Sequence, residues 1–180
     1  MPDSAELDRL VLRESDETDI PAITAIYRQA VLTGCSTLEI EPPSEAEMKI
    51  RRRLLLAANY PFLVAESDGK VVGFAFANLY RQRPAYAKTV ENSIYVREGV
   101  QGRGVGARLL SALIAETSSR GFRQMIAVIG DAANEGSIRL HAKLGFAIVG
   151  RLGAVGAKQG RWLDTVLMQL PLGVDERQSS

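Results

Sequence analysis

The alternation of apolar and polar positions along the chain predicts a series of strands and helices. Short runs rich in β-branched and aromatic residues are typical of strands, and apolar residues that recur three or four positions apart are typical of helices. Such runs predict strands at residues 10–13, 62–66, 71–80, 93–96, 125–129, 146–149 and 163–170. Helical spacing predicts helices from Thr18 or Asp19 to Gly34, from Ser44 to about Ala58, from Gly104 to about Arg120 and from Asn134 to Leu144. This order favours an α+β sheet with helices on both faces rather than a uniform βαβ alternation.

Local signals refine these elements. Ser44 to Glu47 matches a capping box, which marks the start of the second helix. Gly73 interrupts a predicted strand and so indicates a bulge or the close approach of another backbone. Gly153 to Gly160 predicts a glycine-rich turn between the last two strands. Arg51 to Arg53 predict a solvated face on the second helix, although one of the three could touch a ligand.

Composition narrows the class of protein. The 180 residues favour a single domain over 1–180, with its core at about 10–170 and flexible ends. With 22 basic and 21 acidic residues, the net charge of +1 indicates neither a nucleic acid nor a membrane as partner. No apolar run approaches the roughly 20 residues of a membrane span, and the acidic N-terminus does not resemble a signal peptide. The single cysteine, Cys35, excludes an intramolecular disulfide, and we expect a cytoplasmic protein.

A glycine-rich loop joins the strand at 93–96 to the third helix. Glycines let a backbone approach an anion closely, and the first free amides of a helix point at the anion with the positive end of the helix dipole. Arg103 adds a charge that can pair with phosphate. This layout predicts a site for a ligand that carries a pyrophosphate.

Two kinds of pyrophosphate ligand fit this loop. Gly102 to Ala107 match the dinucleotide fingerprint G-x-G-x-x-G/A, and Asp131 ends the next strand, where a ribose-binding acid can lie. The lengthened connection at residues 97–101 and the lack of repeated βαβ units argue against a dinucleotide fold. The loop also contains the pattern Q-x-x-G-x-G, from Gln101 to Gly106, directly after a strand. This pattern resembles the acyl-coenzyme A pyrophosphate loop of the GCN5-related N-acetyltransferases, abbreviated GNAT.

The resemblance to the GNAT family extends from about Leu10 to Leu170, and it favours one branch, the phosphinothricin and methionine sulfoximine/methionine sulfone N-acetyltransferases. The segments that carry it are Glu41-Pro42-Pro43, Arg81 to Tyr86, Thr89 to Val96, Asn134 to Phe146 and Gly160 to Asp164. The resemblance implies a mixed, mostly antiparallel sheet of about seven strands that splays at its centre. It also implies acetyl-coenzyme A as co-substrate without a metal, a homodimer, and acetylation of the α-amino group of a small amino acid or analogue.

The family's cofactor contacts carry over to three segments of this chain. The strand before the glycine loop pairs with the pantetheine arm through its backbone, so its side chains can belong to the core. An asparagine at the start of the fourth helix contacts the cofactor arm and can also cap its helix. The implied cofactor-binding residues are Ile94, Tyr95, Val96, Gly102, Arg103, Gly104, Val105, Gly106, Ala107 and Asn134.

The resemblance also implies two catalytic residues. Glu91 matches the branch's proposed catalytic carboxylate, which can accept the ammonium proton directly or through a water. The alternative for Glu91 is an exposed glutamate at the end of a strand. His141, the only histidine, lies seven residues after Asn134, where many GNAT enzymes carry a tyrosine that protonates the coenzyme A thiolate. His141 is therefore either an acid or proton relay, or a core residue whose hydrogen bonds are satisfied.

Donors for the carboxylate or phosphinate of a substrate are expected near Glu91. The implied substrate-binding residues are Arg81, Gln82, Arg83, Glu91, Asn92 and Ser93. The loop at 81–83 and Asn92 depart from the residues usual in this branch, which leaves the acceptor open. Other acceptors are a protein N-terminus or a polyamine, and the two arginines disfavour a polyamine. The remaining alternative is a non-catalytic acyl-coenzyme A binding module, which has no need of Glu91.

Overall fold

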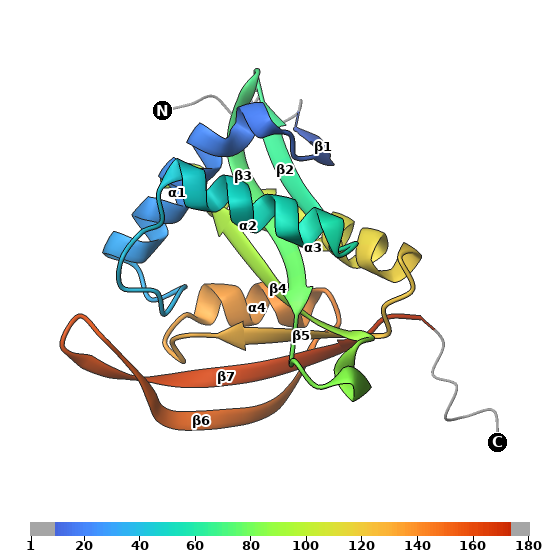
Figure 1. Ribbon diagram of the computed structural model, residues 1–180. Coiled ribbons are helices and arrows are strands. Elements are labelled where there is room, and N and C mark those ends of the chain that lie inside the picture. Colours follow the sequence, from blue (N-terminus) through green and yellow to red (C-terminus); the bar gives the residue numbers. More distant parts are fainter. Residues whose placement is uncertain (1–9, 174–180) are drawn as a thin grey trace.

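Seven strands form one open sheet in the computed structural model, which describes residues 10–173 (Figure 1). The strands are β1 (Val11–Glu14), β2 (Phe62–Ser67), β3 (Lys70–Leu79), β4 (Thr89–Val96), β5 (Gln124–Ile129), β6 (Ala147–Lys158) and β7 (Arg161–Pro171). Their spatial order is β1-β2-β3-β4-β5-β7-β6, and within this sheet only β4 and β5 pair in parallel. This sheet confirms the predicted mixed, mostly antiparallel architecture and excludes the doubly wound fold of the dinucleotide interpretation. The expected flexible ends, at residues 1–9 and 174–180, lie outside the described residues.

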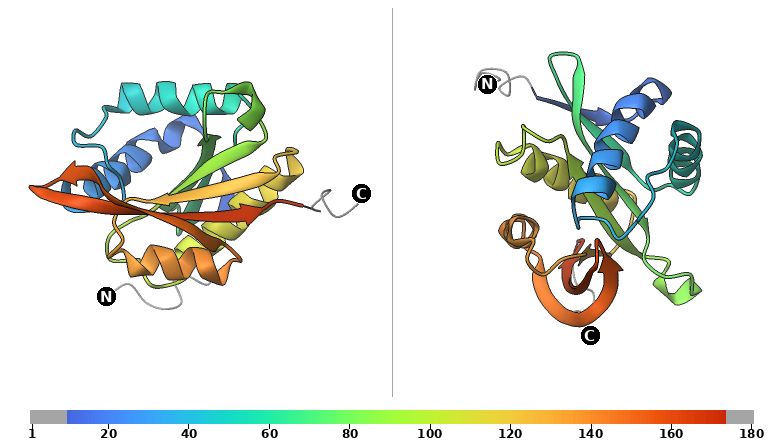
Figure 2. Two further views of the ribbon diagram at one scale, coloured as in Figure 1. Left: turned by 90° about the horizontal axis from the view of Figure 1, so that it is seen from below. Right: turned by 90° about the vertical axis from the view of Figure 1, so that its left-hand side faces the viewer.

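Four α-helices cover the sheet within the described residues, two on each face (Figure 2). They are α1 (Ile20–Thr33), α2 (Glu45–Ala57), α3 (Val105–Ser119) and α4 (Glu135–Lys143), and two short 3₁₀ turns are η2 (Glu17–Asp19) and η3 (Pro84–Tyr86). The right-hand view of Figure 2 shows α1 and α2, in blue and teal, on one side of the sheet and α3 and α4 on the other. Each α-helix begins and ends within two residues of its predicted bounds, and the three-layer α+β prediction is confirmed.

Two apolar layers hold the helices to the sheet. Leu109 and Leu113 of α3 are fully buried in the layer between the sheet and α3. Ile23 of α1 and Phe74 of β3 are fully buried in the layer on the opposite face. Apolar residues three and four positions apart share one side of a helix, which is why the spacing in the sequence predicts these contacts. Within residues 10–173, no helix combines the length and the apolar character that crossing a membrane requires.

The sheet opens at its centre, where β4 and β5 separate. The two strands pair over only four positions, from Thr89 opposite Gln124 to Asn92 opposite Ala127. Beyond this point β4 continues beside β3, and β5 continues beside β7. Figure 1 shows the two arrows diverging. The predicted central splay is confirmed, and it leaves part of the β4 edge without a strand partner.

Gly73 on β3 marks both features that its position in the sequence suggests. The register between β2 and β3 shifts next to it, between Ala65 and Glu66. A Cβ atom at Gly73 would lie 3.0 Å from Leu109 Cδ1 and 3.0 Å from the carbonyl oxygen of Tyr95. Because there is no room for a side chain, glycine allows β3 to pack tightly between α3 and β4.

The glycine-rich turn predicted at residues 153–160 is wrong. Strand β6 runs on to Lys158, and the connection to β7 is the short turn at Gln159 and Gly160, whose φ angles are +52° and +72°. The glycine-rich part of β6 stays in the sheet with a register shift between Leu152 and Gly156. The Asp164 carboxylate on β7 stabilises this irregular segment, because it accepts a hydrogen bond from the Ala154 amide at 2.9 Å.

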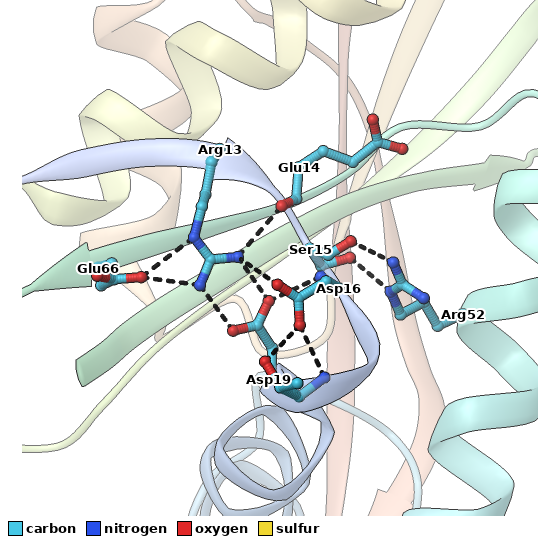
Figure 3. A network of polar contacts seen from close by, with 8 residues as sticks. Arg13, Glu14, Ser15, Asp16, Asp19, Arg52 and Glu66 are labelled. Carbon is cyan, nitrogen blue, oxygen red and sulfur yellow. Dashed lines mark hydrogen bonds and ion pairs between the residues drawn. The ribbon is translucent and has the colours of Figure 1, made fainter. Parts of the chain in front are cut away.

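The start of α1 corrects the predicted cap. Asp16 caps the turn η2, and Asp19 occupies the N-cap position of α1 without a side-chain capping bond. Arg13 instead donates two hydrogen bonds to the Asp19 carboxylate, at 2.7 and 2.8 Å, and two to Glu66 on β2, at 2.8 and 3.1 Å (Figure 3). Because Asp19 is buried, its charge requires such partners. This network ties the end of β1 and the start of α1 to β2.

Arg52 corrects the predicted solvated face of α2. Its neighbour Arg53 is exposed and pairs with Glu17, as the prediction requires. Arg52 is only 8% exposed, and it donates to the Ser15 hydroxyl at 2.8 Å and to the Ser15 carbonyl oxygen (Figure 3). Successive helical residues point about 100° apart, so a run of three arginines cannot remain on one face.

Candidate active site

A cavity of about 1070 Å³ lies where β4 and β5 separate. Its lining includes Tyr27 of α1 and Met48 of α2 on one face of the sheet. On the other face it includes Gly104, at the start of α3, and His141 of α4. The cavity therefore passes through the gap between the two strands, and a ligand in it can contact groups from both helical layers.

The glycine loop presents backbone amides to this cavity. Gly102 and Gly104 have φ angles of +76° and +85°, in the left-handed region that favours glycine. Gly104 is the N-cap of α3 and has no side chain to cap it, so the amides from Val105 to Ala107 are left for another acceptor. Gln101 donates from Nε2 to the Val96 carbonyl oxygen at 3.2 Å, which closes the loop. A cradle of this kind fits a pyrophosphate.

Most of the predicted cofactor-binding residues line the cavity, namely Ile94, Tyr95, Val96, Gly102, Gly104, Gly106, Ala107 and Asn134. Two do not: the Val105 side chain is buried in the α3 core, and Arg103 is half-buried outside the lining. The side chains of Ile94 and Val96 pack against the α3 core, and that of Tyr95 packs against the α1 core. The backbone of this segment is therefore what β4 can offer to a ligand in the gap, as the resemblance implies.

Helices α3 and α4 approach each other at the edge of the cavity. A Cβ atom at Gly106 would lie 3.3 Å from Leu140 Cδ2 of α4. Asn134 caps α4, because its Oδ1 accepts a hydrogen bond from the Ser137 amide at 3.1 Å. The capping interpretation of Asn134 is thus confirmed, and its contact with a cofactor stays a prediction.

Glu91 is half-buried in the wall of the cavity. Successive side chains of a strand alternate between faces, and its neighbours Val90 and Asn92 face the α3/α4 layer. Glu91 therefore faces the α1/α2 layer, where it lies opposite Asn78 of β3. Burial raises the pKa of the Glu91 carboxyl, and the positive charge of Arg81 opposes part of this rise. A carboxylate with a raised pKa is a better base near neutral pH.

His141 lies in the same cavity from the opposite face of the sheet and is buried. Its Nδ1 donates to the Ser137 carbonyl oxygen at 2.8 Å, and its Nε2 lies 3.1 Å from Oδ1 of Asn92. Burial lowers the pKa of the His141 ring, and the bond to Ser137 partly opposes this. Since the Asn92 amide has both a donor and an acceptor end, it can satisfy Nε2 with or without a proton.

The predicted substrate residues separate into two groups. Asn92 and Ser93 line the cavity beside Glu91. The loop of Arg81, Gln82 and Arg83 is exposed and does not form part of the cavity wall, and the Arg81 guanidinium lies 5.1 Å from the centre of the Tyr80 ring. Arg81 nevertheless acts on Glu91 through its charge. The roles of the loop residues in binding stay predictions.

Residues 23–146 match the sequence profile of the Acetyltransferase (GNAT) family. The chain belongs to this family. The matched segment contains Glu91, the glycine loop and His141. As a GNAT acetyltransferase the protein uses acetyl-coenzyme A, which agrees with the uncapped helix start and the open β4 edge. Among residues 10–173, no group of three or more His, Cys, Asp or Glu side chains could hold a metal ion.

Named relatives belong to the branch that the sequence suggests. The chain is 48% identical over 160 residues to a phosphinothricin N-acetyltransferase of Alcaligenes faecalis, covering 89% of this chain and 81% of the relative. It is 39% identical over 166 residues to an L-methionine sulfoximine/L-methionine sulfone acetyltransferase of Salmonella typhimurium, covering 91% of this chain and 95% of the relative. A crystal structure of a GNAT superfamily phosphinothricin acetyltransferase from Sinorhizobium meliloti in complex with AcCoA is also similar to this chain. Its TM-score to this chain is 0.89 at 48% identity, and the match covers 91% of this chain and 89% of that one. The predicted family and fold are confirmed.

The fold of this chain also places in the cavity residues that the sequence alone does not single out. They include Tyr27, Thr37, Glu39, Phe76, Asn78 and Ser137. Arg51, one of the three arginines of α2, also lines the cavity and pairs with Glu39 at 2.6 Å. Asn78 carries a signal that could have been used, because asparagine is depleted in strands and this one ends an apolar strand. Tyr27, Thr37 and Glu39 come from α1 and the loop that follows it, which meet β4 only in the fold.

Proposed function

We propose that this enzyme transfers the acetyl group of acetyl-coenzyme A to the α-amino group of a small amino acid or analogue of the phosphinothricin, methionine sulfoximine or methionine sulfone type. The observation that carries the proposal is the position of Glu91, a half-buried carboxylate with a raised pKa in the wall of the same cavity that holds the uncapped start of α3. The relatives that act on these compounds match nearly the whole length of the chain.

The chain's own groups can perform the binding and the first proton transfer. The amides at the start of α3 hold the pyrophosphate, and the β4 backbone from Ile94 to Val96 hydrogen-bonds the pantetheine arm along its open edge. When bound, acetyl-coenzyme A supplies the thioester carbonyl that a neutral amine attacks. Glu91 takes the proton of the acceptor's ammonium at a carboxylate oxygen, directly or through a water.

His141 is the candidate for the second proton transfer. It reaches the cavity from the α4 side, whereas Glu91 reaches it from the α1/α2 side. The two groups can therefore act on opposite sides of the gap between β4 and β5. Because the neutral ring carries its proton on Nδ1, His141 in this role first takes up a proton at Nε2 and then passes it to the departing sulfur, while Asn92 holds the ring in place.

The acceptor's acidic group is assigned to the loop before β4. Arg81 lies close enough to Glu91 to lower its pKa, so a small molecule whose amine contacts Glu91 can place its carboxylate or phosphinate toward Arg81. Gln82 and Arg83 follow in the same exposed loop, and Ser93 adds a hydroxyl inside the cavity. The same face of the sheet carries Phe62 and Phe76 in the cavity lining, and these rings suit the aliphatic part of such an acceptor.

The proposal extends to assembly and location. We infer that the chain acts as one catalytic domain in a homodimer, without nucleic acid or membrane as partner. Apolar side chains exposed along β6 and β7 support the dimer, among them Ile148, Val149, Val155 and Trp162. The near-balanced charge and the single cysteine support a cytoplasmic enzyme.

A thiol-release assay tests the activity. Purified protein is given acetyl-coenzyme A with methionine sulfone, methionine sulfoximine, phosphinothricin or a polyamine, in parallel with Glu91→Gln. We expect turnover of the amino-acid analogues and a loss of about 10²- to 10⁴-fold in kcat in the variant, the usual range for removal of a general base. Glu116→Gln, which changes a partly exposed glutamate of α3 that pairs with Arg120 and does not line the cavity, is the matched control and should keep wild-type turnover.

Three outcomes would contradict parts of the proposal. Turnover of the polyamine alone would change the acceptor class. Binding of acetyl-coenzyme A without acetylation of any amine would make the protein a binding module. Full activity in Glu91→Gln would remove the carboxylate from the mechanism while leaving the reaction in place.

A further inference from the structure

One polar atom in the cavity wall has no place in the function described so far. Two buried side-chain oxygens among residues 10–173 lack a hydrogen-bond partner, Thr24 Oγ1 and Asn78 Oδ1. Thr24 lies on α1 and is not part of the cavity lining, whereas Asn78 lines the cavity. Buried acceptors are almost always satisfied in native proteins, and one that is not calls for a specific explanation.

The sheet places Asn78 beside the proposed base. Three consecutive pairs link β3 and β4 on the α1/α2 face: Phe74 with Tyr95, Phe76 with Ser93, and Asn78 with Glu91. Side chains directly opposite each other on antiparallel strands have Cβ atoms about 4.5–5.5 Å apart. The Asn78 amide and the Glu91 carboxylate are therefore neighbours on one face and share one cavity.

The chemistry of this pair suits an amine. An ammonium group has three N–H donors and no acceptor, and the pair offers it one charged and one neutral oxygen. We propose that Asn78 Oδ1 accepts a hydrogen bond from the acceptor's α-amino group and so orients this group beside Glu91. This inference rests on the proposed function. When Glu91 removes one proton, two N–H groups remain on the neutral amine. The lone pair is left pointing at Glu91, and rotation of the amine about its C–N bond turns it into the cavity while Asn78 accepts a hydrogen bond from one of the two N–H groups that remain.

The neutral amide is essential to this arrangement. A carboxylate at position 78 could also accept the hydrogen bond, but its charge would oppose the ionisation of Glu91 and raise the pKa of the pair. An amide oxygen holds both the ammonium and the neutral amine without competing for the proton. Asn78 therefore binds the substrate, and Glu91 alone takes the proton.

Asn78→Leu tests the inference, because it keeps the approximate size of the side chain and removes its oxygen. We expect kcat/KM for the amine to fall about 10- to 100-fold, as for the loss of one hydrogen bond to a charged group, with the KM for acetyl-coenzyme A unchanged. Because Oδ1 has no protein partner, the melting temperature should stay the same or rise. Thr24→Val is the matched control: it removes the other unpaired oxygen and should leave amine kinetics unchanged.

Asn78→Asp supplies the second readout. It should retain amine binding, and it should move the acid limb of kcat/KM to higher pH. A structural role for Asn78 predicts instead a lower melting temperature in Asn78→Leu with an unchanged amine KM.

The outcomes distinguish this inference from the proposed function. If wild-type protein acetylates methionine sulfone and Asn78→Leu keeps kcat/KM within twofold, only the role of Asn78 is overturned. If wild-type protein neither acetylates the amino-acid analogues nor binds methionine sulfone in calorimetry, the proposed function and the inference fall together.

Discussion

Glu91 has a carboxyl whose pKa is raised by burial and lowered in part by Arg81. As a base it works only when ionised, so activity should be lost on acidification at a higher pH than the ordinary glutamate pKa of about 4.3 requires. Arg81→Gln removes the opposing charge and should move this acid limb of kcat/KM to still higher pH. A pH profile of kcat/KM for the amine measures the shift.

Two further variants serve as controls for this pH profile. Glu91→Gln should lack the acid limb, because its side chain does not titrate. Arg83→Gln removes a charge from the same exposed loop without a resolved effect on Glu91, so it should leave the limb at its wild-type position. An identical shift in both arginine variants would mean that loop charge in general, rather than Arg81, acts on the carboxyl.

Arg52 and Arg53 provide a second test with matched residues. Arg52→Ala should lower the free energy of unfolding by about 2 kcal/mol, because it leaves the buried hydroxyl and carbonyl oxygen of Ser15 without their charged donor. Arg53→Ala removes only an exposed ion pair with Glu17 and should change stability little. Urea denaturation of both variants measures the difference, and equal losses would contradict the role assigned to Arg52.

These residues show what the sequence can predict at this scale. Glu91 and the glycines of the loop, which line the cavity, could be expected there because family patterns and backbone rules act over a few neighbouring positions. The burial of Arg52 could not be expected, because its partner Ser15 lies 37 positions away and meets it only after α2 packs. An asparagine in an apolar strand marks Asn78 as unusual, but its position opposite Glu91 depends on a register that the sequence does not show.

At the scale of elements, Gly73 connects three of them. In Gly73→Ala the new Cβ would lie 3.0 Å from the Tyr95 carbonyl oxygen and from Leu109 Cδ1. Either β4 or α3 must move, and we expect a loss of about 1–3 kcal/mol in the free energy of unfolding. Because Tyr95 belongs to the wall of the cavity, the KM for acetyl-coenzyme A should rise as well.

Gly150→Ala is the matched control for this test. Gly150 lies on β6, and the nearest atom to its added Cβ is Leu167 Cδ1 at an ordinary 3.9 Å. Chemical denaturation and acetyl-coenzyme A kinetics should both stay near wild type in this variant. A similar loss in the two variants would show that any alanine in the sheet is harmful and that the close approach at Gly73 is not special.

The elements themselves were largely predictable, with one instructive failure. Helix bounds follow from apolar spacing and caps, which are local. The end of β6 does not, because glycine composition alone favours a turn at 153–160. Pairing with β7 and the hydrogen bond from the Ala154 amide to Asp164 keep that segment in the sheet, and both contacts come from another strand.

At the scale of the whole molecule, the exposed apolar side chains of β6 and β7 favour a dimer. The Trp162 side chain is 73% exposed. We expect a dimer in sedimentation velocity and a shift toward monomer in Trp162→Glu, because a buried charge at an interface is costly. Ile50→Glu, at an exposed isoleucine of α2, should stay dimeric. A monomeric wild-type protein would overturn the proposed assembly.

The order of strands across the molecule could not be derived from the order of elements along the chain. The sequence favours an α+β sheet with two helical layers, yet it does not show that β7 inserts between β5 and β6. The central splay was expected only through family resemblance. It depends on β4 and β5 pairing at four positions and then following different neighbours, which no local pattern encodes.

The short pairing of β4 with β5 divides the sheet into two parts. One part is β1 to β4, the other is β5, β7 and β6, and only four residue pairs join them. Beyond these four pairs the edge of β4 has no strand partner, so an extended ligand with its own amide groups can pair with it as an added strand. We therefore expect the sheet to be most rigid when acetyl-coenzyme A is bound. Hydrogen exchange of the backbone amides from Ile94 to Val96 should slow when acetyl-coenzyme A is added. Unchanged exchange there would mean that the two parts of the sheet are already held rigidly together without the ligand.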